Sequence, residues 1–169
     1  PPLMRSLWAP RLLEGLDWIA ATVADNRKSG REPLASEIYG KAEIAGVQLS
    51  GIADRIDRMP DGGLAIVDYK TGGAPSNRAV IEGYNLQLGL LAALAELGGF
   101  PDIAGEAVAF EYWSLAKKGG SDGFGHVRSP TQGRGDNIIA ADAMVDHAVA
   151  RFNKAADDYI LGSKEMTAK

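Results

Sequence analysis

Charged residues stand inside two segments whose other residues are typical of β-strands. Asp54 lies in residues 51–57 (GIADRID), and Asp68 and Lys70 lie in residues 66–72 (IVDYKTG). Two carboxylates that face each other across a sheet repel and destabilise it. A divalent cation between them reverses this effect, because hard cations such as Mg²⁺ prefer carboxylate oxygens. The types and spacing of these residues therefore predict a metal site.

The connection between the two segments decides which charges face each other. Residues 59–63 (MPDGG) are typical of a hairpin turn. With this loop length Asp54 lies directly across from Asp68, whereas a slip of one residue breaks the pairing. Lys70 shares the face of Asp68, because alternate residues of a strand point the same way. Its ammonium could orient an attacking water or stabilise charge on a phosphate, which favours phosphodiester hydrolysis.

The alternative interpretation is that these charges are merely solvated. Strand ends often carry such charges, and an Asp-x-Lys pair alone is a weak pattern. The Gly-x-x-Asp strand before it and the hairpin turn strengthen the catalytic interpretation. We expect Ile52, Asp54 and Ile56 to share one face of the first strand, which leaves Asp57 on the other face in a structural role.

The composition limits the remaining possibilities. The 169 residues, 46% of them hydrophobic and 24% charged, fit one domain over residues 1–169 with a frayed tail at 162–169. The absence of cysteine excludes disulfides, zinc–thiolate sites and iron–sulfur clusters within this chain. A net charge of −4 argues against a broad nucleic-acid-binding surface but leaves room for a local basic groove. No signal peptide or apolar run of about 20 residues is present, so we expect a soluble, cytoplasmic protein.

Hydrophobic periodicity predicts a mixed β-sheet flanked by α-helices, which is an α/β fold. The expected strands are residues 36–45, 47–58, 64–70 and 106–115. The glycine-rich residues 117–135 are expected to form a long loop.

Three helices are expected around this sheet. They are residues 8–28, residues 77–97 with Ser76 or Asn77 as the cap, and a last helix capped by Asp136 or Asn137. The first helix is predicted to pack an apolar stripe on the sheet: Leu12, Leu13, Leu16, Ile19, Ala20 and Val23. The second helix is predicted to carry its own stripe: Val80, Tyr84, Leu88, Leu91 and Ala95.

Three stretches in this order resemble the PD-(D/E)XK nuclease superfamily: residues 51–57, residues 66–72 and residues 84–88 (YNLQL). More narrowly, they resemble the RecB-like nuclease domain at the C-terminal end of AddB-type helicase–nuclease subunits. The resemblance implies a restriction-endonuclease-like fold and a Mg²⁺-dependent DNA exonuclease, with Mn²⁺ as an alternative metal. It also implies a role in recombinational repair of double-strand breaks, together with an AddA-like partner subunit.

The same resemblance implies roles for single residues. Asp54 and Asp68 correspond to the metal ligands of the family, and Lys70 corresponds to its catalytic lysine. The backbone carbonyl of Tyr69 is a further ligand in this pattern. Gln87 corresponds to the Gln/Tyr motif on the helix after the core, where it could hold a phosphate or the lysine; a half-buried, satisfied amide is the alternative.

Further residues are candidates with two interpretations each. Glu37 aligns with the acidic residue before the Gly-x-x-Asp strand and is a candidate metal ligand. Tyr84 and Arg55 could contact DNA, although Arg55 could equally be a solvated charge. The basic residues of the glycine-rich loop could meet a DNA backbone or be solvated: Lys117, Lys118, Arg128 and Arg134.

The chain also departs from the family pattern. The family has a histidine on a helix well before this hairpin, and His126 and His147 both follow it. Many AddB-type domains also hold an iron–sulfur cluster through cysteines, which this chain lacks. Its first residue is Pro, so we expect a piece of a larger protein. The alternative function is a catalytically silent, nuclease-like module that binds DNA or docks a subunit.

Overall fold

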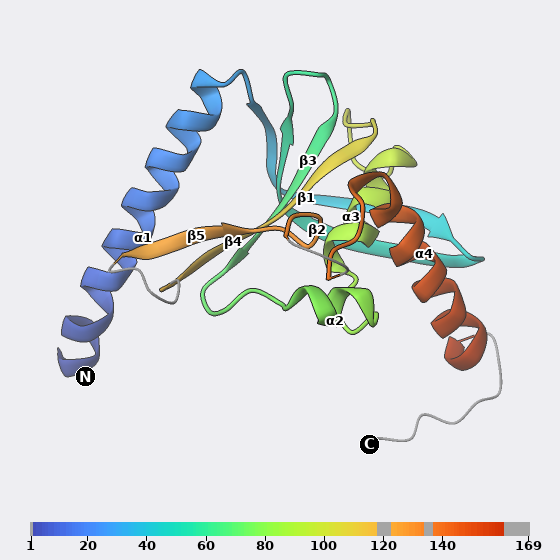
Figure 1. Cartoon of the computed structure of the whole chain (residues 1–169). Helices are drawn as coiled ribbons and strands as arrows, with labels where there is room; N and C mark the ends of the chain where they lie inside the picture. The colour runs from blue at the N-terminus through green and yellow to red at the C-terminus, as the bar shows by residue number, and fades with distance from the viewer. Residues whose placement is uncertain (1, 118–122, 134–136, 161–169) are drawn as a thin grey trace.

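The computed structural model describes residues 2–117, 123–133 and 137–160. Its centre is a five-stranded sheet in the order β1-β2-β3-β4-β5. Neighbouring strands are antiparallel except β3 and β4, which are parallel. The strands are β1 (Glu32–Ile44), β2 (Val47–Arg58), β3 (Leu64–Lys70), β4 (Ala107–Lys117) and β5 (Phe124–Arg128). This mixed sheet flanked by helices confirms the predicted α/β class (Figure 1).

Three longer helices surround the sheet. α3 (Gln87–Glu96) lies against it, and α4 (Met144–Ala155) packs on α3. α1 (Pro2–Lys28) runs past the far end of the sheet, where it meets β5 and β4 (Figure 1). The shorter segments are α2 (Asn77–Ile81), a 3₁₀ turn (Ala141–Ala143) and a π-helical turn (Ala156–Ile160). None of these helices in the described part of the chain is long and apolar enough to cross a membrane.

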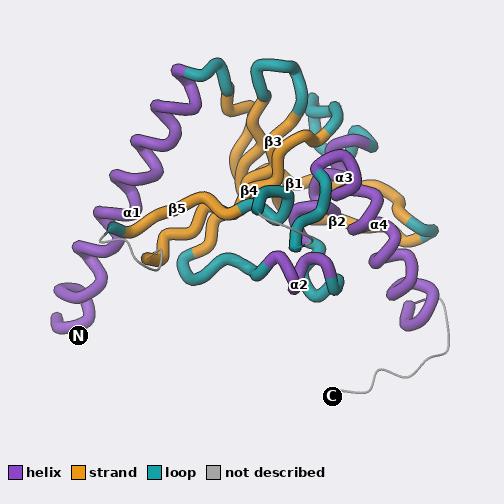
Figure 2. The backbone as a smooth tube through the Cα atoms, in the orientation of Figure 1, coloured by secondary structure: helices purple, strands orange, loops and turns teal. Residues whose placement is uncertain are grey.

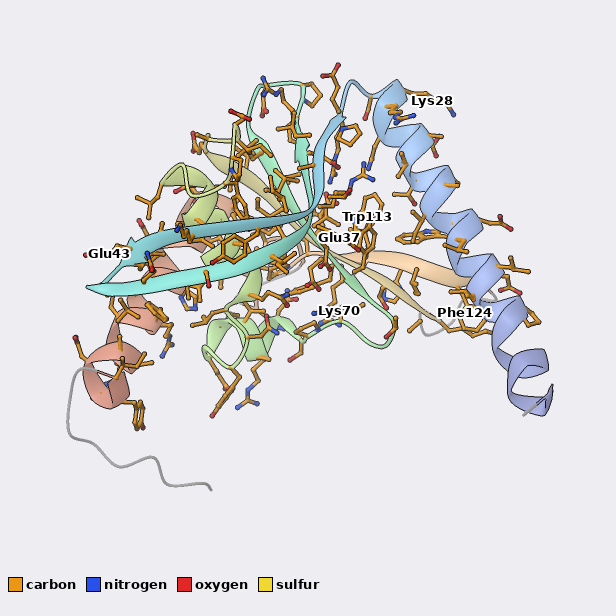
Figure 3. The ribbon with its side chains drawn as sticks, turned by 180° about the vertical axis from the view of Figure 1, so that it is seen from behind. Lys28, Glu37, Glu43, Lys70, Trp113 and Phe124 are labelled. Atoms are coloured by element: carbon orange, nitrogen blue, oxygen red, sulfur yellow. The ribbon has the colours of Figure 1, made fainter. Side chains whose placement is uncertain are left out.

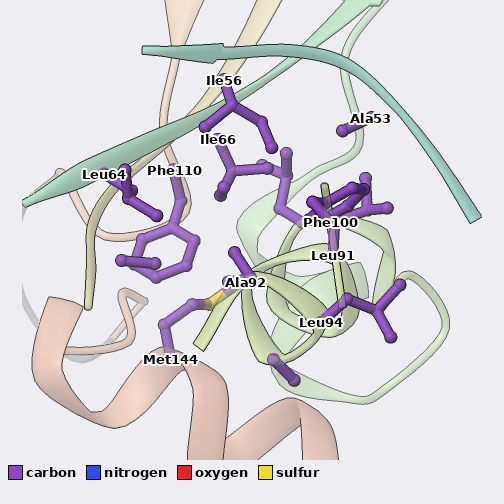
Figure 4. Packing of buried hydrophobic residues seen from close by; sticks show 14 of the residues in the cluster. Ala53, Ile56, Leu64, Ile66, Leu91, Ala92, Leu94, Phe100, Phe110 and Met144 are labelled. Atoms are coloured by element: carbon purple, nitrogen blue, oxygen red, sulfur yellow. The ribbon is translucent and has the colours of Figure 1, made fainter. Parts of the chain in front are cut away.

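The hydrophobic core lies between the sheet and α3 (Figure 4). Ile56, Ile66 and Phe110 project into it from β2, β3 and β4 and are fully buried. α3 is apolar on most of its surface, because the sheet covers one side and α4 another. Gly89 permits this close packing, since an added Cβ would overlap the Cβ of Ala148. The core therefore holds α3 firmly against the strands that carry the charged hairpin.

The helix predicted over residues 77–97 is broken into α2 and α3 (Figure 2). Gly83 has a φ of 85°, a left-handed conformation that glycine adopts at little cost, and the chain turns there. Ser76 caps α2 as predicted, because its side chain accepts a hydrogen bond from a backbone N–H of the first turn. The break removes Tyr84 from the apolar stripe and leaves it 83% exposed. It also makes Gln87 the first residue of α3.

β5 forms within residues that the sequence pattern assigns to a loop. It pairs antiparallel with the end of β4. Gly125 has a φ of 96°, and an added Cβ would overlap the indole of Trp18 on α1. Glycines are depleted in strands and hide the strand pattern here. β5 is therefore held as a strand by its pairing with β4 and its packing against α1, although its local sequence does not predict a strand.

The apolar stripe predicted for α1 is not buried as expected. α1 ends at Lys28 as predicted, but Leu12, Leu13 and Leu16 are 55%, 61% and 49% exposed. The helix crosses the narrow end of the sheet, so only part of its length meets strands. Trp18 makes the main contact, with its ring edge-on to Trp113 at 5.8 Å between centroids.

The last helix begins later than predicted, at Met144. The 3₁₀ turn Ala141–Ala143 precedes it, and residues 137–140 are not helical; there the N–H of Ile139 donates to the carbonyl of Pro130. The predicted cap Asp136 and the predicted tail at 162–169 lie outside the described residues.

Candidate active site

The hairpin between β2 and β3 has the predicted loop, Met59 to Gly63. The N–H of Met59 donates to the carbonyl of Gly63 at 2.8 Å and closes it. The paired residues run from Arg58 with Leu64 to Arg55 with Val67. One further step in the same register places Asp54 across from Asp68.

Asp54 lies at the point where the pairing between β2 and β3 ends. The regular ladder between the two strands ends at Arg55, and the carboxylate of Asp54 then takes over as a hydrogen-bond acceptor for β3. Its Oδ2 accepts from the backbone N–H of Tyr69 at 2.8 Å. The side chain is therefore fixed to the strand that carries Asp68 and Lys70.

A bend in β1 and β2 occurs at the same place. Glu37 on β1 has a φ of 51°, and the pairing of β1 with β2 is interrupted between the pairs Ser36 with Arg55 and Ile38 with Ala53. Strict alternation fails across this bend: Ala53 and Ile56 are both fully buried in the core, as Figure 4 shows. Ile52 is 57% exposed, so the predicted shared face of Ile52, Asp54 and Ile56 is wrong. The left-handed residue at Glu37 is the physical reason.

Asp68 is a buried carboxylate with two charged neighbours, Lys70 and Asp54. Its Oδ2 lies 2.7 Å from Lys70 Nζ, although the angles are not those of a hydrogen bond, and this atom has no hydrogen-bond partner in the described residues. Burial raises the pKa of the Asp68 carboxyl, Lys70 opposes that shift, and Asp54 adds to it. Two carboxylates beside a single ammonium are costly to bury, and a divalent cation would offset the cost.

Lys70 joins β3 to the first turn of α3. Its Nζ donates to Gln87 Oε1 at 3.0 Å and lies 5.8 Å from the centre of the Tyr112 ring. Figure 3 shows Lys70 at the end of β3, beside the chain that leads toward α2. The structure thus brings together Asp54, Asp68, Lys70 and Gln87 from β2, β3 and α3.

The residues at this point fit a hard divalent cation. Mg²⁺ is commonly held by one or two carboxylates while it keeps several waters. Asp54 and Asp68 supply two carboxylates, and the Oδ2 of Asp68 has only the Lys70 ammonium beside it. A backbone carbonyl from Tyr69 on the same strand could complete the protein ligands. In the described ranges no three His, Cys, Asp or Glu side chains gather as a metal cluster, and a ligand role for Glu37 stays a prediction.

The predicted DNA-contacting residues lie in different surroundings. Tyr84 is exposed in the connection between α2 and α3. Arg55 is buried, with Nε 2.7 Å from Asp57 Oδ1. Lys117 ends β4, and its Nζ lies 5.3 Å from the centre of the Phe124 ring. Lys118 and Arg134 lie outside the described residues.

A buried ionic network lies near the site and was only partly visible in the sequence. Asp57 is fully buried and accepts from Arg55 and Arg31, both at 2.7 Å. Arg31 also reaches Glu111 at 2.8 Å, and Glu111 accepts from Trp113 Nε1 at 2.7 Å. This arrangement agrees with the structural role expected for Asp57. Acidic and basic residues within the buried strands β2 and β4 were the signal available in the sequence.

The network also supports the active-site strand. The Trp113 ring lies edge-on to the Tyr69 ring at 5.7 Å between centroids. The Arg55 guanidinium lies 5.1 Å from the centre of the Trp113 ring. Tyr69 is the residue between Asp68 and Lys70. The position of β3 therefore depends on Trp113 on one face of the sheet and on α3 on the other.

Two residues of β4 complete the surroundings and had no sequence signal of their own. Tyr112, opposite Asp68, donates its hydroxyl to Asn85 Oδ1 at 2.7 Å, and burial followed by the charge of Asp68 raises its pKa. Ser114, opposite Lys70, donates to the carbonyl of Gly72 at 2.7 Å. The Tyr112 bond fixes the connection between α2 and α3 at Asn85, and the Ser114 bond fixes the connection after β3 at Gly72.

The fold and the site together define a class of protein. A mixed sheet whose central strand carries Asp-x-Lys beside a second carboxylate is the arrangement expected of a restriction-endonuclease-like fold. A sequence profile of the PD-(D/E)XK nuclease superfamily matches residues 2–163, and the chain belongs to this superfamily. A comparison with curated proteins gave no match.

Proposed function

We propose that this chain is a metal-dependent deoxyribonuclease domain that hydrolyses phosphodiester bonds. The observation that carries the proposal is the buried Asp68 carboxylate: its Oδ2 lies 2.7 Å from the Lys70 ammonium, and burial together with Asp54 still raises its pKa. A purely structural domain gains nothing from such a group, because an imperfectly paired buried charge lowers stability. A nuclease uses it as a metal ligand.

The residues have distinct tasks in this proposal. Asp54, Asp68 and the carbonyl of Tyr69 would hold Mg²⁺ or Mn²⁺. When bound, such an ion stabilises negative charge on a phosphate and makes water a better nucleophile at neutral pH. Lys70 donates hydrogen bonds that orient the attacking water or stabilise the charge that develops on the phosphate. Gln87 accepts from Lys70 and holds its ammonium in place.

We further propose that the domain is of the RecB-like type found in AddB-type subunits. It would then act as an exonuclease in recombinational repair of double-strand breaks, in the cytoplasm, with an AddA-like partner. The order of the three motifs supports this narrower proposal: Gly-x-x-Asp, Asp-x-Lys and the Tyr/Gln stretch before α3. The nuclease domain would span residues 1–169 as one unit.

The test is DNA cleavage by the full-length protein and by this chain. End-labelled linear DNA and circular single-stranded DNA are incubated with Mg²⁺, with Mn²⁺ or with EDTA. We expect cleavage of linear DNA with either metal and none with EDTA. Asp68→Asn is expected to abolish cleavage and Lys70→Ala to slow it by about 10²–10³-fold, while circular dichroism remains unchanged. Unchanged cleavage in either variant contradicts the assignment.

Calorimetry separates the enzyme from a silent module. Metal binding that disappears in Asp68→Asn supports the nuclease. If the chain binds DNA but no divalent metal at millimolar concentration, the module is favoured. Cleavage of circular DNA would contradict the exonuclease proposal while leaving the nuclease proposal intact.

A further inference from the structure

A second surface lies beyond the active site, at the ends of β4 and β5. It is an open cleft of about 670 Å³ whose basic lining residues are Lys117, His126 and Arg128. None of the lining residues that the structure describes is acidic, although the chain as a whole carries a net charge of −4. In the part of the chain that the structure describes, this cleft is therefore a local basic surface on an acidic protein.

The sheet register places this cleft on the same face as the candidate active site. Asp68 pairs with Tyr112, and Tyr112 pairs with Arg128. Lys70 pairs with Ser114, and Ser114 pairs with His126. Side chains of directly paired residues point to the same face. Because strands are about 4.8 Å apart, Arg128 and His126 stand about 10 Å across the sheet from Asp68 and Lys70.

The chain that leaves β3 toward the cleft begins with two glycines. Gly72 and Gly73 follow Lys70, are exposed, and have nothing within 4 Å of an added Cβ. The hydroxyl of Ser114 holds the Gly72 carbonyl at 2.7 Å, which fixes this stretch of backbone to β4. Gly73 itself lines the cleft. A chain of phosphates could therefore approach the backbone closely at Gly72 and Gly73 on its way from the site to the cleft.

The basic groups in the cleft are available to a ligand. Arg128 is exposed, and no carboxylate of the described chain lies within ion-pair distance of it. Lys117 rests over the Phe124 ring, which leaves its ammonium hydrogens free to donate on the outer side. His126 Nδ1 faces the carbonyl of Ala116 at 3.3 Å, so Nδ1 is the donor and Nε2 is turned to other partners.

We propose that this cleft binds the phosphodiester backbone of the substrate DNA strand next to the scissile phosphate, with Arg128 and Lys117 as the phosphate contacts. The inference rests on the proposed nuclease function for the identity of the strand. It adds the path of the DNA strand across the β-sheet, from β3 over Gly72 and Gly73 toward β5.

DNA binding without cleavage tests this inference. A fluorescent single-stranded oligonucleotide is titrated with the whole chain in EDTA, at several salt concentrations. Arg128→Ala and Lys117→Ala are each expected to raise Kd about threefold and to lower the salt slope by about 0.7, which corresponds to one lost phosphate contact. Matched controls are Arg58→Ala and Lys41→Ala, exposed basic residues on β2 and β1 outside the cleft. The controls are expected to bind like the wild type, and thermal unfolding checks that all four variants are folded.

The outcomes distinguish this inference from the nuclease proposal. If the wild type cleaves DNA but neither cleft variant changes Kd or salt slope, the cleft assignment is wrong and the nuclease stands. If the cleft variants weaken binding selectively but the wild type cleaves nothing, the cleft stands and the nuclease proposal fails. Equal weakening by all four variants, or no DNA binding at all, overturns the cleft assignment.

Discussion

The Asp54 carboxylate accepts a hydrogen bond of 2.8 Å from the backbone N–H of Tyr69. Tyr69 stands between Asp68 and Lys70, so this bond ties one candidate metal ligand to the strand that carries the other. It forms where β2 and β3 separate and the backbone of β2 no longer serves as acceptor. Asp54 therefore has two separable contributions, a negative charge and a hydrogen-bond acceptor.

Substitutions at Asp54 should separate these contributions. Asp54→Asn keeps an oxygen acceptor for the Tyr69 N–H but removes the charge, whereas Asp54→Ala removes both. We expect both variants to lose metal binding in calorimetry. In urea unfolding, Asp54→Ala is expected to lose about 1 kcal/mol more than Asp54→Asn, the typical net contribution of one hydrogen bond. Equal stability of the two variants would show that the bond to Tyr69 is unimportant for the fold.

The stability of Asp68→Asn should depend on metal. Without divalent cations the variant is expected to be as stable as the wild type or more stable, because burial outweighs the Lys70 ammonium and raises the pKa of the Asp68 carboxyl, so the folded state disfavours its charge. With Mg²⁺ at a hundredfold excess over Kd, the wild type gains about 2.7 kcal/mol by mass action and the order reverses. Urea unfolding with and without Mg²⁺ measures this. Asp102→Asn, an exposed control, should respond to Mg²⁺ like the wild type.

Gln87 should affect the rate less than Lys70 does. Lys70→Ala removes the proposed donor to the reacting groups, and loss of one such donor typically lowers kcat by about 10²–10³-fold. Gln87→Ala leaves the ammonium 2.7 Å from Asp68 but removes its second partner, so we expect a smaller loss of about tenfold. Single-turnover cleavage measures both. Gln48→Ala, an exposed glutamine on β2, is the matched control, and a Gln87→Ala rate equal to that control contradicts the positioning role.

The network around Asp57 should be essential for folding. Asp57→Asn leaves two buried guanidinium groups, Arg31 and Arg55, without their shared carboxylate. Breaking a buried ion pair in this way typically costs about 3–5 kcal/mol. Chemical denaturation of the variant should show this loss, whereas Asp17→Asn on the exposed side of α1 should change stability little. A loss below about 1 kcal/mol would mean that water or other groups satisfy both arginines.

Local sequence determined the charged hairpin and most of the strands. β2 and β3 have the predicted bounds, because alternating branched residues and the Pro-Asp-Gly-Gly turn are strong signals that act over a few residues. The five-residue loop also set the register that leads to Asp54 and Asp68. The family resemblance on the same motifs agrees with the superfamily to which the chain belongs.

Tertiary structure decided the features that depend on contacts distant in the chain. β5 exists because β4 and Trp18 hold a glycine-containing segment that has little strand propensity of its own. The break at Gly83 makes Gln87 the first residue of α3, within hydrogen-bond distance of Lys70, which no periodicity indicates. The bend at Glu37 changes which side chains of β2 are buried. Sequence patterns report local preference, whereas these positions are set by packing between elements that only the folded chain brings together.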